Sequence, residues 1–575
     1  MNQVDVVVML HSHLPYVLNH GRWPHGSDWI CEAAIDTYLP LIEKFRALDA
    51  LNIAAPATVG FTPILANQLE HATFVKELEA YFDQRLRFCD EAPDSLESTG
   101  DSHLLPLVDF WRSRLVRLRL LFHEIDRDIP REFRRLQEAE RLEITSSAAT
   151  HGFLPMLARD ESIRLQLALG AAEHQRIFGR RAEGCWVPEC AYRPPGEWAP
   201  LGRQPVLRDG TETHVAWAGF RYFFVDAHMA GAGSPLGLYG ERFDGEVVHV
   251  ADEAPNGRFL ASQTPYEAYR VTDESEERDV AALVRDPRSS AQVWSRHGGY
   301  PGAASYLEFH KIRWPGGLKL WRVSEPGTDL GSKAPYEPDA ARQQATAHAG
   351  HFARLLDRVA VAQVEKGGTV IVAPFDAELF GHWWFEGPDF LGDFYAHLPD
   401  YSDLRATTAG RHLDAHAPRS GLRLGEGSWG ANGDFSMWNG PLVAWTWPVI
   451  WNVEERFWSL APRALANERT HEILSQAARS MLLLQSSDWQ FIISTGEVED
   501  YAIRRFNGHA EDCRNLLDAV EHVLNGGDLS PAVQLTRELQ ARDDVFREII
   551  PSIQAAISDR RPATGVAPEL LVADR

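Results

Sequence analysis

The chain has 575 residues, a formal net charge of −24 and a sequence pI near 5.4. This length can bury a large core and predicts about two to four domains, or one large barrel with additions. The acidic charge is spread along the sequence, which argues against a nucleic acid or an anionic membrane surface as a partner. A neutral or cationic substrate fits the charge better.

The cysteines and the N-terminal residues indicate in which cellular compartment the protein is expected. The five cysteines, Cys31, Cys89, Cys185, Cys190 and Cys513, lack the C-x-x-C spacing of a zinc site. We therefore expect free thiols in a reducing compartment. The first ten residues lack the pattern of a signal peptide, and no apolar run reaches the roughly 18 residues of a membrane span. We expect a cytoplasmic protein.

Five short apolar segments predict strands, and each one ends in titratable side chains. The segments are 4–10, 144–150, 186–188, 221–225 and 369–375. They lead, in the same order, into His11 and His13, His151, Glu189, Asp226 and His228, and Asp376 and Glu378. Apolar strands separated by helix-length segments predict a parallel sheet covered by helices. Reactive groups at one end of all the strands favour a β/α barrel over a doubly wound sheet.

The remaining segments predict how the barrel is extended. Residues 156–180 and 340–365 have the apolar period of outer-ring helices. We expect a catalytic barrel over 1–420 that contains a helical insertion at 74–142 and a substrate-loop region at 227–335, with a possible hairpin at 241–250. Residues 421–556 predict a helical C-terminal domain, and 557–575 a disordered tail.

Glu189 is the first candidate for chemistry. It lies among Trp186, Val187 and Pro188, where an ionised carboxylate is costly unless it is paired or reactive. One interpretation is a structural ion pair with Arg193, and the other is a reactive carboxylate.

The pair His11 and His13 allows a metal site, because imidazoles at the end of a strand suit zinc. His151, Asp226 or His228 could then supply a third ligand. The alternative, which we favour, is that these histidines form hydrogen bonds to substrate hydroxyls or to a catalytic carboxylate. The sequence offers no second close pair of ligands.

Several segments in order resemble the motifs of glycoside hydrolase family 57, and within it most resemble the 1,4-α-glucan branching enzymes. The segments are His11–Tyr16, Ala149–Pro155, Trp186–Tyr192, Phe375–Trp384, Ser428–Gly430 with Trp438–Asn439, and Ser486–Trp489. The resemblance covers about residues 4–520.

The resemblance implies an α/β fold, namely an incomplete (β/α)7 barrel with a helical insertion and a helical C-terminal domain. It implies that Glu189 is the nucleophile, that Asp376 is the general acid/base, and that Tyr239 in the loop 231–240 shields the intermediate. The implied contacts to an α-glucan substrate are His11, His13, Trp29, His151, Trp294, Trp429, Trp438, Asp488 and Trp489. Each of the tryptophans Trp29, Trp294, Trp429 and Trp438 could instead be a core residue. No metal or cofactor is implied.

The implied roles agree with the chemistry of retaining transfer, which needs one ionised and one protonated carboxyl group about 5 to 5.5 Å apart. Arg193 or a nearby histidine could keep Glu189 ionised. The aromatic residues around Asp376 favour its neutral form. Glu378 is expected to support the site rather than to react.

Three functions compete. The first is a branching enzyme that cleaves an α-1,4 link and transfers the chain to a 6-hydroxyl of a glycogen-like glucan. The second is an α-amylase or a 4-α-glucanotransferase of the same family, with the same carboxylates and different loops. The third is a non-catalytic glycan-binding protein, against which the intact Glu189 and Asp376 argue. A metal-dependent hydrolase on a related barrel is a more distant alternative.

Overall fold

The computed structural model describes residues 3–23, 25–200, 202–235, 263–272, 277–294, 299–314, 316–325 and 327–558. Tyr239, the predicted hairpin at 241–250 and the tail from 559 onwards lie outside these residues. None of the helices described is long and apolar enough to cross a membrane.

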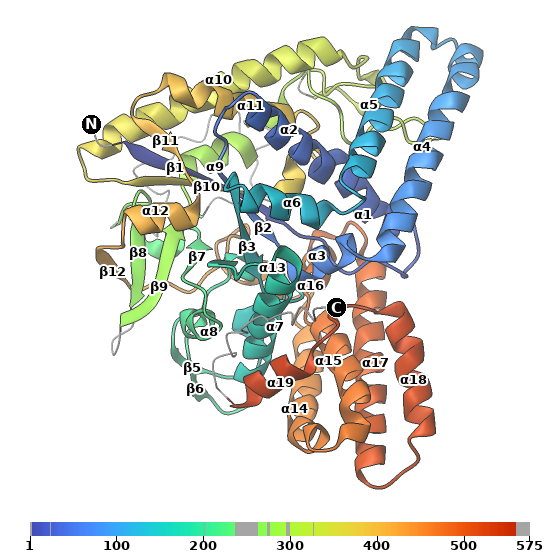
Figure 1. The fold of residues 1–575 in the computed structure, drawn as a ribbon, viewed down its shortest axis with the longest axis vertical. Coiled ribbons are helices and arrows are strands. Elements are labelled where there is room, and N and C mark those ends of the chain that lie inside the picture. The colour runs from blue at the N-terminus through green and yellow to red at the C-terminus, as the bar shows by residue number, and fades with distance from the viewer. Residues whose placement is uncertain are drawn as a thin grey trace, which may run out of the picture.

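A curled parallel sheet forms the centre of the molecule (Figure 1). Its seven strands, counted in the described part of the chain, follow the spatial order β10, β1, β2, β3, β4, β7 and β9. Their bounds are β1 Val4–Ser12, β2 Ala57–Phe61, β3 Leu142–Ser147, β4 Gly184–Trp186, β7 Tyr222–Val225, β9 Glu277–Val284 and β10 Val370–Asp376. All nine residues of β1 are buried, because neighbours pair with it on both sides and helices cover it.

The two outer strands of this set, β9 and β10, meet at a narrow seam. Arg285, just after β9, forms an isolated parallel bridge with Val372 of β10, and the amide of Asp286 donates to the carbonyl of Val372 at 2.8 Å. Ladder pairing continues along every other junction, so the barrel is barely closed here. This arrangement confirms the predicted incomplete (β/α)7 barrel.

Short strands extend the sheet beyond the barrel. β8 (Ala268–Thr272) pairs antiparallel with β9, and β12 (Ser420–Leu422) pairs with β8. β11 (Leu404–Ala406) lies beside the start of β1. A separate hairpin of β5 (Gly196–Trp198) and β6 (Val206–Arg208) follows β4.

Helices surround the barrel, as the periodic segments predicted. They are α1 Ser27–Ala33, α2 Leu39–Ala50, α3 Pro63–Leu69, α7 Asp160–Phe178, α8 Thr211–Trp217, α9 Pro287–Trp294, α10 Pro338–Val364, α11 Gly387–His397 and α12 Ala409–Ala415. The predicted helices at 156–180 and 340–365 correspond to α7 and α10. Between α1 and α2, residues Ala34–Tyr38 form a turn of π-helix.

Two further groups of helices extend from the barrel. The first contains α4 (Ala72–Thr99), α5 (Leu105–Glu124) and α6 (Ile129–Glu138), and α4 and α5 pack side by side at the upper right of Figure 1. The second contains α13 Ser436–Asn439, α14 Thr446–Leu465, α15 His471–Leu484, α16 Asp488–Thr495, α17 Glu499–Leu524, α18 Ser530–Arg542 and α19 Ile550–Ser558. The helices α14, α15, α17, α18 and α19 of this group lie in the lower part of Figure 1. The last helix, α19, returns to pack on α7 of the barrel. The five cysteines are all buried and free.

The close contact of α7 with β3 gives a prediction about stability. A Cβ atom on Gly170 of α7 would lie 2.2 Å from the carbonyl oxygen of Ser147. Gly170→Ala should therefore destabilise the protein by about 1 to 3 kcal/mol, since helix and strand must separate. Gly508→Ala is a matched control, because a Cβ there in α17 meets no atom within 4 Å.

We expect Gly508→Ala to stabilise the protein by about 0.5 to 1 kcal/mol, because alanine loses less backbone freedom in a helix. Calorimetric unfolding midpoints of both variants test the contact. An unchanged midpoint for Gly170→Ala would show that α7 does not press on β3.

Candidate active site

Glu189 lies in a strained turn at the carboxyl end of β4. Its φ is 59° and that of Cys190 is 48°, which is the left-handed region that such residues rarely adopt. His151, at the end of the neighbouring strand β3, also has a positive φ, of 57°. These turns direct the side chains across the end of the barrel, and the surrounding structure must hold them there.

The first segment that holds the Glu189 turn follows β12. Gly427 and Tyr192 exchange main-chain hydrogen bonds of 2.8 and 3.1 Å. The amide of Trp429 donates to the carbonyl of Glu189 at 3.0 Å, and its indole Nε1 donates to Glu189 Oε2 at 2.9 Å. Backbone and side chain of Glu189 are thus both fixed by residues about 240 positions later.

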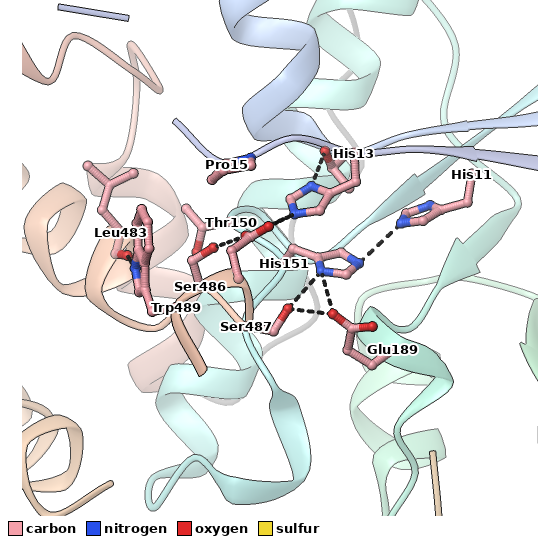
Figure 2. A network of polar contacts seen from close by, with 12 residues as sticks. His11, His13, Pro15, Thr150, His151, Glu189, Leu483, Ser486, Ser487 and Trp489 are labelled. Carbon is pink, nitrogen blue, oxygen red and sulfur yellow. Dashed lines mark hydrogen bonds and ion pairs between the residues drawn. The ribbon is translucent and has the colours of Figure 1, made fainter. Parts of the chain in front are cut away.

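The second segment lies between α15 and α16 (Figure 2). Ser486 forms an antiparallel bridge with Gly152, and the amide of Ser487 donates to the carbonyl of His151 at 3.0 Å. The Ser487 hydroxyl is 2.8 Å from Glu189 Oε1 and 2.9 Å from His151 Nδ1. Each carboxylate oxygen of Glu189 therefore has its own donor, and both donors come from the C-terminal part of the chain.

Burial raises the pKa of Glu189 to about 7, and the hydrogen bonds from Trp429 and Ser487 act against that rise. The nearby negative charge of Asp488 adds to the rise, and His13 opposes it. The carboxyl group is thus close to the point where it is half ionised at neutral pH.

The suggested ion pair between Glu189 and Arg193 is wrong. The Arg193 guanidinium lies over the ring of Trp198, 5.3 Å from its centroid. The left-handed turn at Glu189 and Cys190 separates the two side chains, so that the indole, hydroxyl and imidazole groups described above surround the carboxylate instead.

Asp376 ends β10, beside His11 in the register of β1. Burial raises its pKa well above the ordinary value, and the negative charges of Glu378 and Glu189 act in the same direction, against Arg285. The two carboxyl groups, Glu189 and Asp376, are therefore close enough to influence each other, and the surroundings of Asp376 favour its neutral form.

Glu378 lies in the same charged cluster. Its Oε1 accepts from the Tyr38 hydroxyl at 2.5 Å and from the amide of His13 at 3.1 Å. Burial raises the pKa of Glu378 to about 7, and these hydrogen bonds oppose the rise. One oxygen of Glu378 is therefore already occupied by a side chain and an amide of the protein itself.

Three histidine rings stack beside Glu189 (Figure 2). His13 lies 3.9 Å from His151, and His11 lies 5.1 Å from His151, between ring centroids. Burial acts to lower the pKa of His13, but the charge and the hydrogen bond of Asp488 outweigh it, and the pKa is raised. Burial and the charge on His13 lower the pKa of both other rings. Protonation is therefore favoured on His13 and disfavoured on His11 and His151.

These contacts also bear on the metal alternative. The Nε2 atoms of His11 and His151 are 3.1 Å apart and hydrogen-bonded to each other, and His13 Nε2 is hydrogen-bonded to the Asp488 carboxylate at 3.0 Å. These ring nitrogens therefore already have partners within the protein. In the described part of the chain, sets of three potential ligands occur elsewhere, at Asp5, His412 and His416, at Asp160, Asp209 and His214, and at His509, Asp512 and Asp543. Arginines bind a carboxylate in each of those sets.

The predicted substrate contacts differ in exposure. His11 and His151 are 2% and 3% exposed, so they contact each other, and His151 contacts Glu189, rather than a sugar. Trp438 and Trp489 are also buried, and Trp438 stacks on Phe153 at 4.9 Å. A sugar cannot stack on a ring without an open face, so we correct these two tryptophans to core residues.

The other predicted contacts remain candidates. Trp29 and Trp294 are half-buried, and Trp429 is 6% exposed because it packs on Trp186 and binds Glu189. Asp488 and His13 are partly open, at 14% and 12% of their side chains. Tyr239 lies outside the described residues.

Sequence reasoning missed three residues of the site. Ser487 lies in the motif Ser486–Trp489, of which only Asp488 and Trp489 were expected to contact substrate. Arg285 is buried over Trp294 and Trp429, binds Ser290 at 2.8 Å, and lies at the barrel seam after a strand that was not predicted. Tyr38 lies in the π-helical turn, which has no simple signal in the sequence.

Comparison with known proteins gives two matching family models. The model of glycosyl hydrolase family 57 matches residues 7–422, and the model described as 1,4-alpha-glucan branching enzyme, C-terminal, matches residues 450–553. A 1,4-alpha-glucan branching enzyme of Thermococcus kodakarensis is 37% identical over 552 residues, which are 94% of this chain and 77% of that protein.

Solved structures resemble this chain along nearly all of its length. The family 57 branching enzyme of T. kodakarensis matches with a TM-score of 0.86 at 36% identity over 96% of both chains. That of Pyrococcus horikoshii matches with a TM-score of 0.87 at 34% identity over 98% of both. The α-amylase AmyC of Thermotoga maritima matches with a TM-score of 0.77 at 27% identity, over 96% of this chain and 99% of that one. The chain belongs to glycosyl hydrolase family 57.

Proposed function

We infer that this protein is a 1,4-α-glucan branching enzyme that acts by retention. The observation that carries the inference is the way in which the C-terminal part completes the site. Ser487 lies within the region matched by the branching-enzyme C-terminal model, and its hydroxyl is 2.8 Å from Glu189. A cytoplasmic location and a glycogen-like product remain predictions from the sequence.

In the first half-reaction, we propose that the ionised Glu189 attacks the anomeric carbon of an α-1,4-linked glucan. Asp376 gives its proton to the oxygen that leaves. Its burial, and the charges of Glu378 and Glu189, keep that proton available. The product is a glycosyl ester on Glu189 and a free chain end.

In the second half-reaction, Asp376 takes the proton of an incoming 6-hydroxyl, whose oxygen displaces Glu189. The carbon is inverted twice, so the α configuration is retained and an α-1,6 branch forms. Trp29 and Trp294, which are half-buried, are our candidates for sugar contacts.

The main alternative is hydrolysis, in which water takes the place of the 6-hydroxyl. The similarity to AmyC shows that this fold also occurs in a protein named as an α-amylase, so the barrel alone does not separate the two outcomes. The experiment that separates them is incubation of the protein with amylose, followed by debranching and chain-length analysis. Debranchable short chains are expected, and reducing ends without branches would instead support the amylase.

The paired carboxyl groups give the first activity prediction. Glu189→Gln should keep the fold and lose more than about 95% of transfer, because covalent catalysis has no alternative route of similar rate. Asp376→Asn should be equally poor on amylose, yet added azide should restore part of one half-reaction, since only proton transfer is lost. Initial rates on amylose and on an activated maltosyl substrate measure both effects. Substantial activity of Glu189→Gln would contradict its role.

Glu378 gives a prediction about pH. Asp376 must be protonated to act as an acid, and the charge of Glu378 raises its pKa. Glu378→Gln should lower the pKa of Asp376, so the alkaline limb of the rate profile should move to lower pH. Glu386→Gln is a matched control, because Glu386 is also buried on this loop but binds Tyr336 instead. Equal shifts in both variants would rule out a specific effect of Glu378.

Tyr239 gives a prediction that rests on the resemblance alone. If its ring excludes water from the intermediate, Tyr239→Ala should lower branching and raise the ratio of reducing ends to α-1,6 links, because water is far more concentrated than any sugar hydroxyl. Both products are measured from one digest. A proportional loss of both would mean that the loop shapes donor binding.

A further inference from the structure

The hydrogen bonds around Glu189 continue beyond the residues that touch it (Figure 2). Ser487 Oγ lies 2.9 Å from His151 Nδ1, and His151 Nε2 lies 3.1 Å from His11 Nε2. The four groups form a chain that starts on β1, crosses the end of β3, passes through the C-terminal part and ends on the nucleophile. His151 Nδ1 also lies 3.5 Å from Glu189 Oε1, farther than the 2.9 Å that separates it from Ser487 Oγ.

The direction of each bond in this chain can be derived from Glu189. An ionised carboxylate only accepts, so the Ser487 hydroxyl donates to Oε1. Its oxygen must then accept from His151, which therefore carries hydrogen on Nδ1. A neutral His151 has a bare Nε2, and this atom accepts from the Nε2 hydrogen of His11.

The surroundings favour this direction over its reverse. His11 Nδ1 is buried and has no partner among the described residues. With hydrogen on Nε2, His11 leaves only an acceptor unpaired, whereas the other tautomer would bury an unpaired N–H, which costs more. The His13 ring is stacked 3.9 Å from His151 and contacts Asp488, which favours protonation of His13, and positive charge on His13 disfavours a second one on His151.

We propose that His11, His151 and Ser487 are positioning residues that form a one-way hydrogen-bond relay and keep the Ser487 hydrogen directed at Glu189. In the reverse arrangement, His151 would have a bare Nδ1, and this atom would compete with Glu189 for the same hydrogen. His11 therefore acts on a carboxylate that it does not touch. This inference rests on the proposed role of Glu189.

The main-chain contacts explain how the relay keeps its geometry. The Ser487 amide donates to the His151 carbonyl, and Ser486 pairs with Gly152, so donor and acceptor side chains come from two backbones in fixed register. On its other side, His11 stacks on Trp186 at 4.6 Å. No bond of the relay depends on a long flexible side chain.

The test is the acid limb of the pH profile for an α-maltosyl fluoride, because fluoride leaves with little help from an acid and the limb then reports ionisation of Glu189. The titratable side chains that face Glu189 are His13, His151, Asp488 and Asp376, and none of them is substituted. Ser487→Ala should move the limb to higher pH by about one unit, since a hydrogen bond to an ionised group is lost.

His11→Phe should also move the acid limb to higher pH. The double variant with both Ser487→Ala and His11→Phe should move the limb no further than the larger of the two single shifts. Ser487→Thr, which keeps the hydroxyl, should move it less than Ser487→Ala. Ser480→Ala is the control, because Ser480 is buried in α15 but makes no hydrogen bond among the described residues. It should leave the limb in place.

The outcomes separate the proposed function of the protein from the proposed relay. If the wild-type protein does not release fluoride, the proposed function fails. If it does, and Ser487→Ala shifts the limb while His11→Phe does not, Ser487 acts alone and the relay is wrong. Additive shifts in the double variant would also overturn the relay, since the two residues would then act independently.

Discussion

The active site depends on two segments from the C-terminal part of the chain, 427–429 and 486–487, which hold the strained turn at Glu189 in place. Glu189 occupies the left-handed region at a cost of about 1 to 3 kcal/mol, and the turn does not persist unless its surroundings fix it. Main-chain pairing at Gly427 with Tyr192, and at Ser486 with Gly152, supplies that constraint from the C-terminal part. The barrel alone presents Glu189 but does not complete its environment.

This constraint also governs the electrostatics. Glu189, Asp376 and Glu378 are buried near one another, so they cannot all be ionised cheaply. Donors from Trp429 and Ser487 favour the anion on Glu189, whereas Asp376 has no such donor among the described residues and remains protonated. Positive charge reaches the cluster from Arg285, which opposes the raised pKa of Asp376, and from His13, whose protonation is favoured by its contact with Asp488.

Much of the barrel could be predicted from the sequence, because buried parallel strands are continuous apolar runs that end in polar residues. Glu189 and Asp376 stand out for that reason. Two barrel strands were not predicted. β2 has only five residues, one of them a glycine, and β9 begins with three charged residues inside the region 227–335 that was expected to be a substrate loop. The contacts of Glu189 could not be predicted either, because Trp429 and Ser487 lie about 240 and 300 positions away and reach it only through tertiary pairing. The solvent exposure of single side chains could not be predicted either, since Trp438 was expected to contact substrate and is buried.

The most direct test of the account is to trap the intermediate. A 5-fluoroglycosyl fluoride of a malto-oligosaccharide slows the second half-reaction, and peptide mass spectrometry then locates the sugar. The account predicts a single modified peptide that contains Glu189 as the esterified residue. A label on Asp376 or Glu378, or turnover without any covalent adduct, would contradict it.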